Sequence, residues 1–232
     1  MDRAVVLMSG GINSAVAAAA MREQCQLAWL HVAWGHRSAE RELIAFEAMT
    51  HHFKADPTLV AELSCMAAIG GNARASRRLS IEDAEVLTGK TPSTFATGLL
   101  PAMVSVAAAW AASLKARRII LGIAADHQTG RYPLSQLYPD HRREFAQACN
   151  LMLAYAVAPG QEIRVETPLI DLNRPEIVKL GRRLGVPFDR TWSCYADNET
   201  PCQRCLGCSD RTVGFVRAGV PDPLAAVPAS AR

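Results

Sequence analysis

The chain has no apolar run of the roughly eighteen residues needed to span a membrane. The alanine-rich stretch 99–114 comes closest, and a buried helix explains it better. The chain also lacks a strong charge bias, because its net charge of +3 is too small to indicate a nucleic-acid binder by itself. We therefore expect neither a membrane nor a nucleic acid as partner.

Internal repeats and low-complexity linkers are absent as well, and 50% of the residues are hydrophobic. A chain of this kind can bury a large core as one unit. The N-terminal residues do not match a secretory signal, which predicts a cytoplasmic, reducing setting. Residues 221–232, rich in proline and alanine, are expected to form a flexible tail.

The first chemical motif is the glycine-rich turn Ser9-Gly10-Gly11-Ile12-Asn13-Ser14, which follows the apolar run 4–8. It has neither the Gly-Lys-Ser/Thr ending of a Walker loop nor the GxGxxG spacing of a dinucleotide turn. Glycines let the backbone approach a ligand closely, and the free N–H groups at the start of the next helix favour phosphate. Ser9 and Ser14 add hydroxyl donors. An ordinary tight turn between strand and helix is the alternative.

The second motif is a cysteine cluster near the other end of the chain. Two CxxC steps share Cys205, and the complete set is Cys194, Cys202, Cys205 and Cys208. This spacing suits tetrahedral zinc, and a closed four-sulfur site would be structural because it leaves no position for a substrate. Disulfides fit a reducing setting poorly, and iron–sulfur clusters use other spacings, but both remain alternatives.

Strands and helices are predicted to alternate along the chain. The expected strands are 4–8, 26–33, 58–63, 118–123 and 162–166, and the expected helices are 14–22, 39–53, 99–114, 140–157 and 174–184. This alternation predicts an α/β fold with a doubly wound parallel sheet, whose ligand crevice lies at the carboxyl ends of the strands. Residues 65–91 match no regular pattern and are expected to form a mobile flap.

The glycine-rich turn resembles the pyrophosphate loop (PP-loop) of the ATP pyrophosphatases, which read Ser-Gly-Gly-x-Asp-Ser after the first strand. Together with the cysteine cluster and Arg211, it is similar to the QueC family of 7-cyano-7-deazaguanine synthases. Other matching segments are Pro92-Ser93-Thr94-Phe95, Tyr138-Pro139-Asp140 with Arg143, and Glu166-Thr167-Pro168-Leu169. The resemblance implies an α/β domain of the adenine nucleotide alpha hydrolase kind over 1–190, with a zinc-binding segment over 191–220 packed on it.

The resemblance also implies an ATP-dependent carbon–nitrogen ligase. Members of the family adenylate 7-carboxy-7-deazaguanine, ammonia displaces AMP to give the amide, and a second round yields the nitrile for queuosine biosynthesis. ATP, Mg2+ and Zn2+ are the implied cofactors, and a homodimer is the expected assembly. One alternative is a specialised ligase, of the kind understood to act in antiviral defence, that stops at the amide by joining the deazaguanine to another amine such as a partner protein. A binding module without turnover is another.

Carried over to this sequence, the family's pattern assigns roles to individual residues. ATP phosphates would bind at Ser9, Gly10, Gly11 and Ser14, with Mg2+ bridging the phosphates. Catalytic roles fall to Asn13 and Arg174. The candidates for binding the deazaguanine are Phe95, Tyr138, Asp140 and Arg143. A helix N-cap is the alternative for Asp140, and a surface ion pair is the alternative for Arg143.

Some positions depart from the family's pattern. Asn13 stands where the family has Asp. The asparagine keeps an acceptor oxygen but lacks the negative charge of the aspartate. Arg174 replaces a lysine, and Leu99-Leu100 replaces an Arg-Asn pair. Residues 130–137 are extra. The two leucines would form an apolar wall suited to a nucleophile bulkier than ammonia, or simply a buried helix start.

Overall fold

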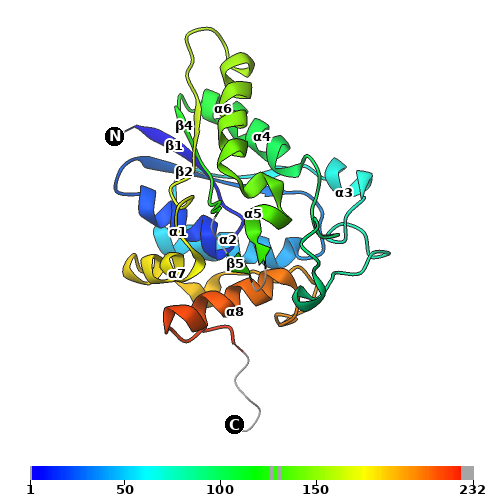
Figure 1. Ribbon diagram of the computed structural model, residues 1–232. Coiled ribbons are helices and arrows are strands. Elements are labelled where there is room, and N and C mark those ends of the chain that lie inside the picture. Colours follow the sequence, from blue (N-terminus) through cyan, green and yellow to red (C-terminus); the bar gives the residue numbers. More distant parts are fainter. Residues whose placement is uncertain (1, 126–127, 130–131, 226–232) are drawn as a thin grey trace.

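The computed structural model describes residues 2–125, 128–129 and 132–225, and its centre is a five-stranded parallel sheet (Figure 1). The strand order is β3-β2-β1-β4-β7. The strands are β1 (Arg3–Leu7), β2 (Gln26–Ala33), β3 (Thr58–Glu62), β4 (Arg118–Ile120) and β7 (Arg164–Glu166). The chain winds outward from β1 in both directions, so the predicted doubly wound sheet is confirmed.

Helices cover both faces of the sheet (Figure 1). Strand β1 is apolar on both sides: Ala4 and Val6 belong to one core cluster and Val5 to the other. The first cluster includes residues of α1 (Ile12–Met21), α2 (Ala39–Phe53), α7 (Arg174–Arg183) and α8 (Leu206–Ala218). The second includes residues of α4 (Leu99–Ser113) and α6 (Arg143–Ala156). Near-continuous apolar strands are what a sheet buried on both faces requires.

Short elements connect these layers. They are α3 (Cys65–Ile69), η1 (Ala84–Val86), β5 (Gln128–Thr129), β6 (Tyr132–Pro133), α5 (Leu134–Leu137), η2 (Pro139–His141) and η3 (Phe188–Arg190). Of the extra residues, 132–137 form β6 and α5, whereas Gly130 and Arg131 lie outside the described residues. Helix α8, which follows the cysteine cluster directly, was not among the predicted helices.

The start of α6 differs from the prediction. Helix α6 begins at Arg143 with Arg142 as its N-cap, so the N-cap interpretation of Asp140 is wrong. Asp140 lies instead in the short turn η2, whose proline fixes a 3-10 geometry ahead of the helix. Within the predicted tail 221–232, Asp222 accepts two hydrogen bonds from Arg211 at Oδ1, at 3.0 and 2.8 Å, and one at Oδ2. Residues 226–232 lie outside the described part of the chain.

The irregular segment 65–91 is tied to the rest of the molecule. Arg37 Nη2 donates to the carbonyl oxygens of Ser76 and Leu79 at 2.6 and 2.7 Å. The side chain of Glu82 accepts from the backbone N–H and the hydroxyl of Ser93. A local sequence pattern could not have predicted these contacts, and the mobility of the segment stays a prediction.

No helix in the described residues combines the length and the apolar character that crossing a membrane requires.

Candidate active site

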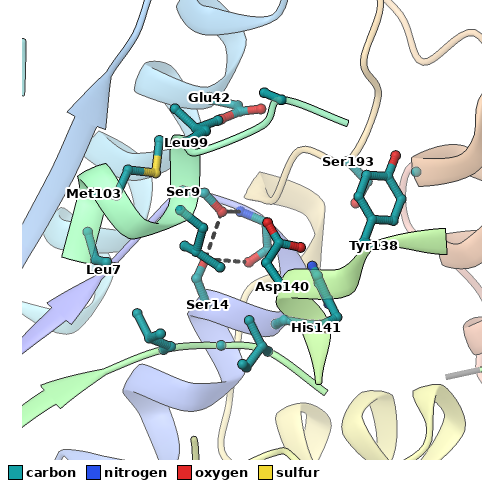
Figure 2. A pocket seen from close by; sticks show the side chains of 18 of the residues that line it. Leu7, Ser9, Ser14, Glu42, Leu99, Met103, Tyr138, Asp140, His141 and Ser193 are labelled. Carbon is teal, nitrogen blue, oxygen red and sulfur yellow. Dashed lines mark hydrogen bonds between the residues drawn. The ribbon is translucent and has the colours of Figure 1, made fainter. Parts of the chain in front are cut away.

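The glycine-rich turn joins β1 to α1, and its Ser9 and Ser14 side chains lie close together (Figure 2). Close contacts fix its backbone. Gly10 has φ +80, and a Cβ there would lie 2.6 Å from Ala45 Cβ and 2.8 Å from the Glu42 carbonyl oxygen of α2. Ser14 Oγ donates to the Gly11 carbonyl at 3.1 Å and lies 3.2 Å from Ser9 Oγ. The first N–H groups of α1 have no partner within the helix and are therefore available to an anion.

Two other segments hold this turn from outside. A Cβ at Gly122, just beyond β4, would lie 2.6 Å from the carbonyl carbon of Asn13 and from the nitrogen of Ser14. The N–H of Trp192 donates to the Gly10 carbonyl at 3.0 Å. The segment that carries the first cysteine of the cluster is thus bonded directly to the turn.

A cavity of about 300 Å³ opens at the carboxyl ends of the strands, where the sheet topology predicts it. Ser9, Asn13 and Ser14 line it at the glycine-rich turn, whereas Tyr138 and Asp140 line it from the segment before α6. In Figure 2, Tyr138, Asp140 and His141 lie on one side and an apolar wall lies on the other. That wall includes Leu7, Leu30, Leu99, Leu100 and Met103. Leu99 is buried at the start of α4 and also lines the cavity, so the predicted buried helix start and an apolar wall are both present. The suitability of this wall for a nucleophile bulkier than ammonia stays a prediction.

Tyr138 is part of a packed aromatic wall. Its hydroxyl lies 2.6 Å from Thr94 Oγ1, and its ring centroid is 6.0 Å from that of Phe95. Burial raises the pKa of Tyr138 well above its usual value, so the hydroxyl stays protonated. The predicted residues Phe95 and Tyr138 therefore both line the cavity, and they do so as neighbours.

Asp140 offers the cavity a carboxylate oxygen that has no partner among the described residues. Its Oδ1 is buried and makes no hydrogen bond. Burial raises the pKa of Asp140 to about 6, although its own backbone N–H and Arg74 act in the opposite direction. Burial lowers the pKa of the adjacent His141 to about 4, so this imidazole is neutral when Asp140 titrates. An acceptor of this kind suits a ligand with paired N–H donors.

Arg143 does not line the cavity. Its guanidinium pairs with Asp171, and half of the side chain is exposed. The structure therefore has the surface ion pair that was the alternative prediction for Arg143.

Sequence reasoning missed a charged cluster formed by Arg74, Glu42 and His36. Glu42 Oε1 lies 2.9 Å from His36 Nε2 and 3.0 Å from Arg74 Nη2. The guanidinium carbon of Arg74 lies 5.1 Å from the ring centroids of both Trp34 and Tyr195. Arg74 and Glu42 line the cavity. The one sequence feature that could have indicated this cluster is the turn-forming residue Asn72. Its Oδ1 accepts from the N–H groups of residues 74 and 75, which forms a turn at Arg74.

Asn13 and Arg174, far apart in sequence, meet at the glycine-rich turn. The Arg174 guanidinium is buried and donates through Nη1 to Asn13 Oδ1 and through Nη2 to Asp210 Oδ2. Burial lowers the pKa of Arg174 to about 9, which leaves it cationic at neutral pH. Asp210 was missed because it belongs to the unpredicted helix α8.

The cysteine cluster is assembled as its spacing predicted. The Sγ atoms of Cys194, Cys202, Cys205 and Cys208 all lie within 4.8 Å of one another, and the Cys202 and Cys208 atoms are 3.9 Å apart. A disulfide would need about 2.05 Å. The N–H groups of Ala196 and Cys202 point at Cys194 Sγ, at 3.4 and 3.3 Å. The four thiols could therefore hold a metal ion.

The sequence matches one family model and several curated proteins over nearly its whole length. The model of the family described as queuosine biosynthesis protein QueC matches residues 3–219. A 7-cyano-7-deazaguanine synthase of Chlorobium phaeobacteroides (strain BS1) is 34% identical over 223 residues, 96% of either chain. A protein of the same name from Koribacter versatilis (strain Ellin345) is 38% identical over 230 residues, covering 97% of this chain and 94% of its own. Among solved structures, an NMN synthetase from Francisella tularensis gives a TM-score of 0.48 at 13% identity, over 95% of this chain and 73% of that one.

The charged cluster predicts how stability depends on pH. Burial opposes ionisation of Glu42, but His36 and Arg74 outweigh it and hold the pKa of the carboxyl at about 2 instead of 4.5. Its contribution to stability is therefore complete above about pH 5 and is lost as the pH falls towards 2. We expect Glu42→Gln to lower the free energy of unfolding by roughly 1–3 kcal/mol at pH 7 and to make stability less sensitive to acid.

Urea unfolding of the parent and the variant between about pH 3 and pH 7 measures both effects. Glu47→Gln on the exposed side of α2 is the matched control, expected to change the free energy of unfolding by less than about 0.5 kcal/mol. Equal acid sensitivity in parent and Glu42→Gln protein would contradict the assignment.

Proposed function

The chain belongs to the QueC family, and we propose that it is an ATP-dependent ligase acting on 7-carboxy-7-deazaguanine. In this proposal it adenylates the acid and transfers it to ammonia, which leads through the amide to 7-cyano-7-deazaguanine. The observation that carries the proposal is that one cavity is lined both by the glycine-rich turn, with its free N–H groups, and by Asp140, whose buried Oδ1 has no hydrogen-bond partner in the described residues.

The nucleotide would bind with its phosphates on the glycine-rich turn. Ser9, Gly10, Gly11 and Ser14 offer hydroxyl and backbone N–H groups, and the positive end of α1 adds to them. Mg2+ bound to the phosphates usually takes one or two protein carboxylates as ligands. The turn has no carboxylate of its own, so these ligands would come from other residues of the cavity, whose lining includes Glu42 and Asp210. When bound, the ion would neutralise charge on the phosphates.

The deazaguanine would lie at the other end of the cavity. Asp140 Oδ1 would accept from the N–H groups of the guanine-like edge, with Phe95 and Tyr138 forming the adjacent wall. This orientation leaves the substrate carboxylate to face the nucleotide. Besides Arg174, the cavity has a second cation, Arg74, which lies close enough to Asp140 to influence its pKa.

The reaction then needs little beyond positioning and charge stabilisation. A carboxylate oxygen attacks the α-phosphorus, the bond to pyrophosphate breaks, and the acyl-adenylate forms. Arg174 and the N–H groups of the turn stabilise the negative charge that develops on the departing pyrophosphate. Ammonia then adds to the acyl carbon, AMP leaves, and the amide nitrogen loses a proton. The apolar wall around Leu99 protects the acyl-adenylate from water.

Zinc is the metal we propose for the cysteine cluster. A tetrahedron with Zn–S bonds of about 2.3 Å has sulfur–sulfur edges of about 3.8 Å, close to the 3.9 Å between Cys202 and Cys208. All four positions would be thiolates, so the ion would stabilise the fold and take no part in chemistry.

One observation favours a second candidate function. Leu99, Leu100 and Met103 give the cavity an apolar wall, and buried apolar surface contributes about 25 cal/mol per Å² to the binding of a carbon-rich nucleophile. A ligase that joins the deazaguanine to another amine, such as one on a partner protein, would stop at the amide.

Product analysis distinguishes the candidates. The protein would be incubated with ATP and 7-carboxy-7-deazaguanine, first with ammonia and then with a panel of amines and short peptides, and the products followed by mass spectrometry. Nitrile from ammonia supports the synthase, whereas an amide of another amine with no nitrile supports the second candidate. Absence of AMP release in every reaction would refute both.

The raised pKa of Asp140 predicts pH-dependent substrate binding. Only the ionised carboxylate can accept two N–H donors, and it forms as the pH rises through about 6. The affinity for 7-carboxy-7-deazaguanine should therefore rise about tenfold between pH 5 and pH 7. Calorimetry measures this, with Asp140→Asn expected to bind weakly and without pH dependence. A pH dependence that survives in Asp140→Asn would exclude this role.

The cysteine cluster gives a further prediction. Purified protein should carry about one zinc ion per chain, and Cys208→Ser should lose it and become insoluble or sensitive to trypsin, because structural zinc contributes on the order of 10 kcal/mol of apparent binding energy. Cys65→Ser, outside the cluster and exposed, is the matched control and should behave like the parent. Metal analysis that finds iron in place of zinc, or no metal, would refute the zinc assignment.

A further inference from the structure

Asp210 joins the cysteine cluster to the glycine-rich turn through a chain of two side-chain contacts. It lies on α8, two residues after Cys208, and is buried. Its Oδ2 accepts from Arg174, and the other nitrogen of the same guanidinium donates to Asn13 Oδ1. All three residues line the cavity. A helix ordered by the cysteines thus reaches a side chain of the turn by way of one arginine.

Helix α8 is shaped to receive this arginine. A Cβ at Gly214, one turn after Asp210, would lie 2.4 Å from Arg174 Cγ and 3.0 Å from Cδ. The missing side chain makes room for the stem of Arg174, and Asp210 on the same face of α8 pairs with its head. Two residues on one helix therefore fix both the place and the direction of the guanidinium.

The direction of Arg174 decides which atoms Asn13 presents. A guanidinium only donates, so the atom of Asn13 that it contacts must be the amide oxygen. The two N–H groups of the same amide then remain for the cavity. An amide held in this way can donate to a phosphate oxygen, whereas its oxygen already accepts from a guanidinium whose positive charge opposes the binding of a metal ion there.

We propose that Asp210 is a positioning residue for nucleotide binding: it holds Arg174 on Asn13, so that the turn presents amide N–H donors to the phosphates of ATP. This inference rests on the proposed function, because it assigns ATP to the turn. It adds a residue outside the turn and a route by which the cysteine cluster influences the affinity for ATP. The second carboxylate oxygen, Asp210 Oδ1, is buried and makes no hydrogen bond with the described residues.

A double-mutant cycle tests this route, with the affinity for ATP measured by calorimetry in the presence and absence of Mg2+. Asp210→Asn should weaken ATP binding at least about fivefold, because Arg174 loses the partner that directs it. The same substitution in an Asn13→Ala background should change the affinity less than about twofold, because the group it acts on is gone. Thermal unfolding and metal content report separately on the fold.

Asp222→Asn is the matched control. Asp222 also pairs with a buried arginine, Arg211, in the same C-terminal segment, but neither residue lines the cavity. Its replacement should lower stability and leave the affinity for ATP unchanged. If Asp210→Asn does not fold, Asp210→Glu replaces it, since it keeps the charge and moves the carboxylate. Asp210→Glu should weaken ATP binding at least about threefold in the parent background, but not in the Asn13→Ala background.

Several results would overturn the inference. They are unchanged or tighter ATP binding by the Asp210 variant, an equal loss in both backgrounds, or an equal loss in Asp222→Asn. If the parent chain itself does not bind ATP, the proposed function fails and this inference fails with it. Parent protein that binds ATP without coupling between positions 13 and 210 overturns the inference alone.

Discussion

Backbone-to-backbone contact at the glycine-rich turn is the constraint on which the rest of the site depends. Gly10 touches α2 and Gly122 touches the first residues of α1, in both cases closer than a Cβ would permit. The turn is therefore held between two layers of the fold and does not have to order itself around a ligand. Pre-organised N–H groups of this kind contribute to binding because little conformational entropy is lost when the ligand arrives.

The same site buries several charges, and each has a specific compensation. Arg174 is paired with Asp210, and Glu42 is paired with Arg74 and His36. Asp140 differs from these because, within the described part of the chain, no cationic side chain is paired with it, its buried Oδ1 makes no hydrogen bond, and its pKa is raised. Buried polar groups usually have hydrogen-bond partners within the protein. A buried polar group in a cavity that has no such partner therefore indicates a position where a ligand supplies one.

Much of the fold could be predicted because it depends on local signals. All five predicted strands of the central sheet are present, and the periodic helices begin and end within a few residues of their predicted bounds. Helix α8 was missed because its pattern is interrupted by two glycines and a cysteine, and the cysteine cluster fixes its start. The residues of the candidate site divide in the same way. Asn13, Tyr138 and Asp140 lie in short motifs, whereas Arg74 and Asp210 reach the cavity only through contacts distant in sequence.

The parallel topology has a consequence for how the protein is made. The cavity draws its walls from the turn near residue 9, from α4, from the segment before α6, and from α8 near residue 210. Pairings this distant in sequence close late in folding, because the entropy of a long loop is lost before the contacts form. A nascent chain that lacks α8 contains the whole sheet and most of the core, but it has neither Asp210 nor a complete cysteine cluster. The walls of the cavity are therefore complete only after α8 has been synthesised and has packed against the rest of the fold.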